Sequence, residues 1–279
     1  MESFKVNILG CGSAKPTLRH YPTSQVVDFR GNLFMIDCGE GTQMQLMRMR
    51  LKPNRLRHIF ISHLHGDHCY GLPGLLSTLG LTGINGHVTV HLPEEGIRLL
   101  KPLIDYSSHD LQVEFQPYEY GNNIIYEDKS LIVNTVPLKH RLPCVGFVFR
   151  EKEKLRHINR EMVDFHQVPV AMLPRIKAGE DYVKPDGTIV TNKILTNQAD
   201  PSRTYAYISD TLPLKAVINE VKGRFTLSRS HFSQRYAKTG KRDVPHHGKR
   251  RCTHCIRGWR ETACNRTFLI TLHQRDAAA

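Results

Sequence analysis

The sequence predicts an α/β sandwich. Short apolar runs rich in β-branched residues come first, between residues 4 and 37, and such runs are typical of paired strands. Between residues 44 and 149, segments with helical spacing of apolar residues are mixed with further strand-like runs. Strands first, followed by strands mixed with helices, favour a sandwich over a doubly wound parallel sheet.

The individual elements follow from the local pattern. Strands at Gln25–Phe29 and Asn32–Asp37 flank the turn FRGN, and residues 44–49 have helical spacing before the break at Pro53. The other predicted strands are Phe4–Leu9, Arg57–Ile61, His87–Leu92, Leu111–Phe115, Ile124–Tyr126, Leu131–Val136, Val145–Phe149 and Thr204–Ile208. Further helices are predicted at residues 70–81, Pro93–Ile104 and Pro213–Lys222.

Two parts of the chain depart from this regularity. From Glu151 to about Ala199, charges, prolines and glycines replace the periodic pattern, which indicates a long insertion of a functional or disordered kind. From Gly223 onward the chain is rich in arginine and poor in acids. The predicted organisation is a domain over residues 1–222, which includes the insertion at 151–199, followed by an aberrant basic tail at 223–279.

Composition narrows the class of protein. Hydrophobic residues make up 40% and charged residues 23% of the 279 residues, as in soluble globular proteins. The start MESFKVNILG has no signal-peptide pattern, and no apolar run is long enough to span a membrane, so we expect a cytoplasmic protein. Seven cysteines without an export signal favour free thiols over a disulfide framework.

The net charge of +13 would by itself suggest a polyanionic partner. Its distribution weakens that inference. The tail holds 13 Lys+Arg and 3 Asp+Glu, a net charge of +10, which leaves 26 Lys+Arg and 23 Asp+Glu, or +3, for residues 1–222. Bulk charge therefore says little about the ligand of the main domain.

The segment SHLHGDHCY, residues 62–70, carries the most specific chemical signal in the chain. Three histidines and an aspartate on one tight loop cannot be core residues without partners, because burying each one costs a desolvation penalty. Imidazole and carboxylate are zinc ligands, and the alternating spacing can supply two ligand sets. The predicted metal ligands in this loop are His63, His65, Asp67 and His68.

Two further ligands are expected from the ends of other strands. His140 follows the strand-like TVPLK, and Asp210 follows YAYIS. Asp37 also ends a strand, but the following CGEG indicates that it braces the loops through hydrogen bonds and does not bind metal. Cys11, Cys69 and Cys144 flank these sites and are interpreted as buried small hydrophobic residues.

These residues match a known pattern. SHLHGDH, together with LGCGSAKPT, IDCGEGTQMQLMR, VPLKHRLPCVGFVFRE and YISDT, resembles the metallo-β-lactamase superfamily and, within it, the ribonuclease Z family of tRNA 3′-processing endonucleases. The resemblance runs from Met1 to about Lys222. It implies an αββα metallo-β-lactamase sandwich with a dinuclear zinc site at one sheet edge, in a cytoplasmic homodimer that acts on precursor tRNA.

The resemblance also implies roles for the candidate residues. His63, His65 and His140 would hold one Zn²⁺, Asp67 and His68 the other, and Asp210 would bridge the two. Metal-activated hydroxide would release the 3′ trailer and leave a 3′-hydroxyl, with Asp67 as the catalytic residue that orients the water or takes its proton. The insertion corresponds to the family's exosite arm for the tRNA body, although nine Lys+Arg against eight Asp+Glu between residues 150 and 200 do not form a strongly cationic surface.

The tail does not continue the resemblance. Where the family has an HEATF segment and later a GHFSxRY strand, this chain has GRFTLSRSHF and NRTFLITLHQR. Read from the second base of permissible codons, these segments can give ADLLYHEATF and IGHFSSRYTN. We therefore hypothesise that the chain is out of frame from Gly223 onward and not natively folded there.

Other interpretations of the tail stay open. An internal deletion could place His231 of HFSQRY on the metal, residues such as Cys252, Cys255 and Cys264 could form a zinc knuckle, and the positive charge could bind RNA nonspecifically. The function has alternatives as well. One is a hydrolase of the same superfamily for small phosphodiesters or esters, and another is an RNA-binding relic that the altered tail has impaired as an enzyme.

Overall fold

The computed structural model describes residues 3–18, 20–83, 86–107, 111–212 and 225–228. Its contacts divide the chain into two units. Among the described residues, unit 2 comprises 128–131 and 150–203, and unit 1 comprises the rest. None of the described helices is long and apolar enough to cross a membrane.

Unit 1 contains a six-stranded sheet in the order β1-β2-β3-β4-β5-β6. The first three strands are antiparallel, and β3 to β6 are parallel. Its strands are β1 (Phe4–Gly10), β2 (Ser24–Phe29), β3 (Asn32–Ile36), β4 (Leu56–Phe60), β5 (His87–Leu92) and β6 (Gln112–Pro117). Strand pairing in this order brings the ends of β3 and β4 side by side.

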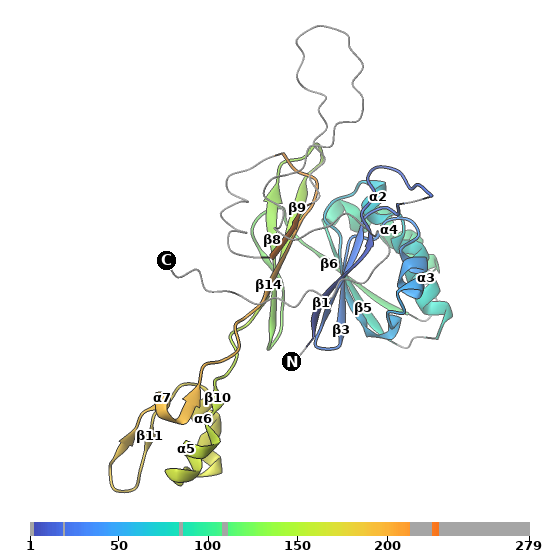
Figure 1. Ribbon diagram of the computed structural model, residues 1–279. Coiled ribbons are helices and arrows are strands. Elements are labelled where there is room, and N and C mark those ends of the chain that lie inside the picture. Colours follow the sequence, from blue (N-terminus) through green and yellow to red (C-terminus); the bar gives the residue numbers. More distant parts are fainter. Residues whose placement is uncertain (1–2, 19, 84–85, 108–110, 213–224, 229–279) are drawn as a thin grey trace. The chain divides into compact units, whose positions relative to one another are not determined.

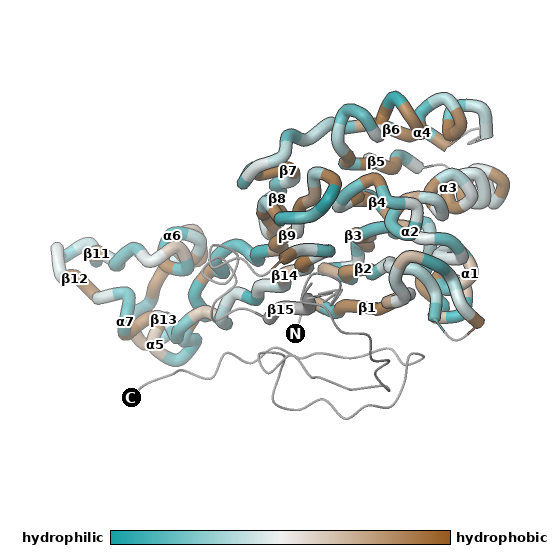
Figure 2. Tube along the Cα trace, turned by 90° about the horizontal axis from the view of Figure 1, so that it is seen from above, coloured by the Kyte–Doolittle hydropathy of each residue, from teal (hydrophilic) through white to brown (hydrophobic). Residues whose placement is uncertain are grey.

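One face of this sheet is covered by helices (Figures 1 and 2). Leucines of the helices pack against Val26, Ile59 and Val90 of the sheet in one buried core. This amphipathic burial, at roughly 1.5–3 kcal/mol for each large aliphatic side chain, is what fixes the helices there. The helical segments are α1 (Thr42–Arg48), η1 (Pro53–Arg55), α2 (Gly66–Cys69), α3 (Leu72–Leu81) and α4 (Glu94–Ser107).

A five-stranded sheet, in the order β15-β14-β9-β8-β7, packs on the other face. The aromatic pairs Phe34–Phe149 and Phe60–Phe147 join the two sheets, with ring centroids 6.3 and 5.6 Å apart. The strands are β7 (Ile124–Glu127), β8 (Leu131–Leu138), β9 (Cys144–Glu151), β14 (Thr204–Ile208) and β15 (Phe225–Ser228). The prediction of an α/β sandwich is confirmed.

Unit 2 has a small core of its own. Val163, Ile176 and Leu195 are buried in it together with Tyr182 and Val190. Its elements are β10 (His157–Ile158), α5 (Arg160–Phe165), η2 (Val170–Met172), α6 (Leu173–Lys177), β11 (Tyr182–Val183), β12 (Ile189–Val190), α7 (Asn192–Leu195) and β13 (Thr196–Asn197). These elements are two to six residues long, which is why the sequence showed little periodicity here.

Two sequence predictions differ from the structure or cannot be compared with it. The motif at residues 63–68 is not one continuous loop, because Asp67 and His68 lie in the first turn of α2. The predicted helix Pro213–Lys222 lies outside the described residues, as does all of the tail except β15, which pairs in parallel with β14.

A histidine pair lies between the sheets and has no part in the motif. His58 Nδ1 of β4 is 3.1 Å from His91 Nε2 of β5, and the His91 ring stacks on Phe60 with centroids 4.5 Å apart. Burial, and secondarily the nearby His58, lowers the pKa of His91 to about 3. His91 therefore stays neutral in the folded protein at pH values where an unfolded chain would protonate it.

This pair predicts a pH-dependent loss of stability. Below the unfolded pKa of about 6.5 the unfolded chain binds a proton that the folded chain excludes, so stability falls as the pH falls. From about pH 7.5 to about pH 5.5, the wild-type protein should lose about 1.4 kcal/mol more than His91→Gln in its free energy of unfolding. Denaturant titrations at both pH values measure this, and equal losses in the two proteins would contradict it.

Candidate metal centre

Four of the predicted site residues follow strands whose ends the fold brings to one edge, and the other two, Asp67 and His68, lie in the short helix α2. His63 and His65 follow β4, His140 follows β8, and Asp210 follows β14. The backbone turns sharply here. A Cβ atom added at Gly71 would lie 2.0 Å from the carbonyl oxygen of Gly39, so only glycine permits this approach of the two loops.

Three histidines form the first potential metal-binding set. His65 Nδ1 is 2.9 Å from His63 Nε2 and 3.2 Å from His140 Nε2. All three nitrogens belong to one group of atoms that could hold an ion. Tetrahedral coordination at about 2.0–2.1 Å would place such nitrogens about 3.3 Å apart, close to the separations found. We call these three residues the histidine set.

A second set lies beside the first and shares His63 with it. His63, His68 and Asp210 offer atoms within 4.8 Å of one another. His68 Nε2 is 3.9 Å from Asp210 Oδ2 and 3.7 Å from Asp67 Oδ2. Asp210 belongs to this second group only, and His63 is the residue that the two groups share. We call His68, Asp67 and Asp210 the carboxylate set.

The donor atoms fit divalent cations. Burial lowers the pKa of His63 to about 3, with the neighbouring His68 as the next cause, and burial followed by His140 lowers the pKa of His65. These imidazoles are therefore neutral at physiological pH, as metal ligation requires. Asp210 Oδ1 is buried and has no hydrogen-bond partner among the described residues, which a bound cation would supply.

Asp37 is fully buried and contacts His68 of the carboxylate set on the side away from Asp67 and Asp210. Its carboxylate accepts hydrogen bonds from the Ser62 amide at 2.7 Å, the Ser62 hydroxyl at 3.0 Å, His68 Nδ1 at 2.7 Å and the Tyr207 hydroxyl at 2.6 Å. Burial alone would raise the pKa of Asp37, but the electrostatic interaction with His68 and these hydrogen bonds outweigh it and lower the pKa. This contact network agrees with the sequence interpretation of Asp37 as a brace.

Asp67 is placed differently from the other candidates. Its Oδ2 accepts a hydrogen bond of 2.8 Å from the amide of Ala14 in the loop after β1. It lies beside His68 but outside both close groups of three potential ligands. Ala14 has a positive φ of 60°, so a locally strained turn aims its amide at the carboxylate.

The residues that support the candidate ligands are not evident from the sequence. Ser62, Tyr118, Tyr207 and Ser209 carry hydroxyls buried around the site. Tyr207 lies within the predicted strand Thr204–Ile208, and Ser62 is the first residue of the motif segment, but neither pattern marks the residue as a support for the site. The alternation in TYAYIS placed Tyr205 and Tyr207 on one face, but it could not show that this face meets Asp37. Of the flanking cysteines, Cys69 and Cys144 are buried as interpreted, while Cys11 is exposed.

Comparisons with known proteins add an independent result. Ribonuclease Z of Bacteroides fragilis is 52% identical to this chain over 226 residues, and the match covers 80% of this chain and 74% of the Bacteroides protein. Ribonuclease Z of Parabacteroides distasonis is 52% identical over 231 residues, with the same coverage of both chains. The crystal structure of the short form of human tRNase Z is 30% identical, with a TM-score of 0.49 over 54% of this chain and 66% of its own. A family model described as anti-Pycsar protein Apyc1 matches residues 4–95, about a third of the chain.

The two-sheet sandwich, with histidines and carboxylates gathered at its strand ends, defines an α/β protein of the metallo-β-lactamase fold, a class of metal-dependent hydrolases. Half of the aligned positions are identical to those of the Bacteroides protein over three quarters of its length. The chain belongs to the ribonuclease Z family.

The role of Asp37 can be tested by removing its charge. Asp37 has a positive φ of 56°, which asparagine tolerates, so Asp37→Asn changes the charge with little effect on the backbone. We expect the metal-free variant to lose about 3–5 kcal/mol of unfolding free energy, because His68 and Tyr207 lose their charged acceptor.

Asp28→Asn is the matched control. Asp28 lies on the same sheet and forms a 2.6 Å ion pair with the partly exposed Arg55. Its replacement should cost less than about 1 kcal/mol. Denaturant unfolding in the presence of a chelator compares the two variants, and similar losses would argue against a special role for Asp37.

Proposed function

We propose that this chain is a zinc-dependent endoribonuclease that removes the 3′ trailer from precursor tRNA and leaves a 3′-hydroxyl. Membership of the ribonuclease Z family supports the reaction and the substrate. The observation that carries the chemistry is that His63 belongs to two close groups of potential ligands, one with His65 and His140 and the other with His68 and Asp210. The same family resemblance supports a homodimer and a cytoplasmic location.

The proposed metal content is the two Zn²⁺ ions expected in the family, with the second site short of the family's terminal histidine in the chain as written. The histidine set would hold one ion, and Asp67 with His68 would hold the other. The family resemblance gives Asp210 the bridging role, and its support here is a buried carboxylate oxygen without a hydrogen-bond partner among the described residues, in a group that includes the shared His63. Imidazole and carboxylate donors in this proportion suit zinc.

The proposed mechanism assigns tasks to individual side chains. When bound, such ions lower the pKa of water and stabilise the charge on the attacking and leaving oxygens of an in-line phosphoryl displacement. Asp67 is the catalytic residue, since it is the one carboxylate of the motif loop and can orient the attacking water or accept its proton. The Ala14 amide holds Asp67 Oδ2 in place during that transfer. Asp37 keeps His68 fixed from behind.

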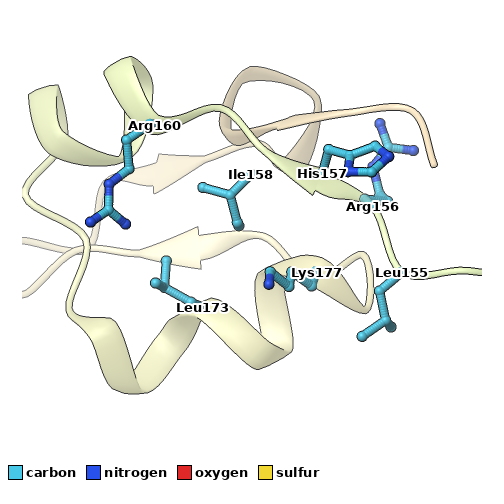
Figure 3. A pocket seen from close by; sticks show the side chains of 7 residues that line it. All are labelled: Leu155, Arg156, His157, Ile158, Arg160, Leu173 and Lys177. Carbon is cyan, nitrogen blue, oxygen red and sulfur yellow. The ribbon is translucent and has the colours of Figure 1, made fainter. Parts of the chain in front are cut away.

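Unit 2 is the proposed exosite arm for the tRNA body. It contains a cavity of about 410 Å³ with basic and aliphatic side chains (Figure 3). Its lining residues are Leu155, Arg156, His157, Ile158, Arg160, Leu173 and Lys177. Arginine and lysine contacts to phosphates suit recognition of an RNA helix by its shape and backbone.

The tail is proposed to be out of frame from Gly223 onward. The match to the Bacteroides relative leaves about a fifth of this chain uncovered, and residues 223–279 make up the same fraction of the chain. The family's HEATF and GHFSxRY segments can be recovered by reading GRFTLSRSHF and NRTFLITLHQR in another frame. The placements of His231 and of a cysteine knuckle concern residues outside the described part of the chain.

Metal content and cleavage test the proposed site together. Elemental analysis should find about two zinc ions per chain, and removing them with a chelator should abolish cleavage of a 3′-extended tRNA. Loss of a residue that only supports a ligand typically costs roughly 10–100-fold in activity. His140→Ala removes a direct ligand, so it should lower kcat/KM by more than that. His87→Ala, which removes an exposed histidine on β5, is the control. Fewer than two zinc ions in the wild-type protein would favour an RNA-binding relic.

The frame proposal has its own test. The chain as written and a chain with the frame restored from codon 223 are assayed side by side on the same 3′-extended tRNA. We expect faster cleavage and tighter zinc binding by the restored chain, because it regains the family's terminal histidine and its last strand. Equal activities, or an unambiguous in-frame read of the gene across codon 223, would refute the proposal.

A further inference from the structure

The Ser62 hydroxyl lies at the centre of the contacts behind the site. Its Oγ is 3.0 Å from Asp37 Oδ2, 3.0 Å from Ser209 Oγ and 3.1 Å from His63 Nδ1. His68 Nδ1 lies at 3.3 Å, but it is closer to Asp37 Oδ2, at 2.7 Å. Ser62 thus contacts a candidate ligand, the brace and the strand that carries Asp210.

The backbone holds Ser62 firmly in this place. Its amide donates to Asp37 Oδ1 at 2.7 Å. Its carbonyl accepts from the Val145 amide at 3.1 Å and from the Tyr118 hydroxyl at 3.3 Å. Ser62 and its side chain are fully buried. The hydroxyl therefore has few alternative directions in which to turn.

The hydrogen positions follow from the donors and acceptors available. A serine hydroxyl has one hydrogen and two lone pairs, and an ionised carboxylate can only accept. The Ser62 hydrogen is therefore directed to Asp37, which leaves its lone pairs for a hydrogen on His63 Nδ1 and for the Ser209 hydroxyl. Cys144 Sγ also lies 3.5 Å from His63 Nδ1, but a thiol is the weaker partner.

This arrangement selects the ring tautomers of two histidines. With a hydrogen on Nδ1, His63 must present the lone pair of Nε2 to His65 Nδ1, the nitrogen 2.9 Å away. His68 reaches the same tautomer by donating from Nδ1 to Asp37, so its Nε2 faces Asp67 and Asp210. Both lone pairs are then aimed at the candidate ligand atoms before any cation binds.

We propose that Ser62 is a positioning residue that fixes His63 in the Nδ1–H tautomer and, through Ser209, ties the His63 loop to the strand carrying Asp210. The inference rests on the proposed function, in which His63 binds zinc through Nε2. It goes beyond that function because it names the group that orients the His63 ring. That group is the Ser62 hydroxyl, which is not itself a candidate metal ligand. Partners of this kind affect metal affinity by roughly 10–100-fold.

The test uses the full chain without metal and without RNA, so it gives an answer even if the protein cleaves no tRNA. Long-range proton–nitrogen correlation spectra of labelled histidine rings report each tautomer, with His63 and His68 assigned from His63→Gln and His68→Gln. In Ser62→Ala, His63 should lose the pure Nδ1–H form, while His68 should keep it because Asp37 still accepts its hydrogen. Ser62→Thr, which restores a hydroxyl, should restore the His63 tautomer.

Ser209→Ala is the matched control. It removes the other hydroxyl of the contact but leaves Ser62 donating to Asp37, so the His63 tautomer should be retained. Zinc competition titrations should show Ser62→Ala binding the first ion roughly 10–100-fold more weakly, with Ser62→Thr close to the wild-type protein. An unchanged His63 tautomer together with unchanged zinc affinity in a folded Ser62→Ala protein would overturn the proposal.

Discussion

The buried carboxylate of Asp37 is the constraint on which the rest of the site depends. A fully buried negative charge is tolerated only when donors surround it, and here four donors from three parts of the chain meet on its two oxygens. Ser62 comes from the end of β4, His68 from α2 and Tyr207 from β14. The requirement to satisfy Asp37 therefore brings together the segments that also carry the candidate metal ligands.

The strands were predictable because their burial pattern is local. Thr204–Ile208 was predicted with the bounds that β14 has, and the other predicted strands of the sandwich agree with the observed ones to within about three residues. Unit 2 was not predictable in the same way. Its helices and strands are too short to show a period, and its core is closed by side chains far apart in sequence, such as Val163 and Leu195.

The candidate ligands were predictable for a different reason. Histidine and aspartate placed directly after apolar runs are conspicuous, because such residues are costly to bury without partners. His63 and His140 were singled out in this way, and the fold brings their rings within 5.2 Å, centroid to centroid. The supporting hydroxyls gave no such signal. Tyrosine and serine are ordinary residues in strands, and only the packing of β14 against the first sheet shows that Tyr207 points at Asp37.

The same packing links the tail to the chemistry. β14 carries Tyr207 and, just after its end, Ser209 and Asp210, so the position of this strand sets the distance between the carboxylate and the histidines. One neighbour of β14 is β9, and the other is β15, whose residues 225–228 belong to the segment that departs from the family pattern. The parallel pairing of β15 with β14 therefore helps to fix the strand that leads to Asp210. Such hydrogen bonds can be made by any sequence that accepts an extended backbone, whereas a metal ligand has to be supplied by a particular side chain.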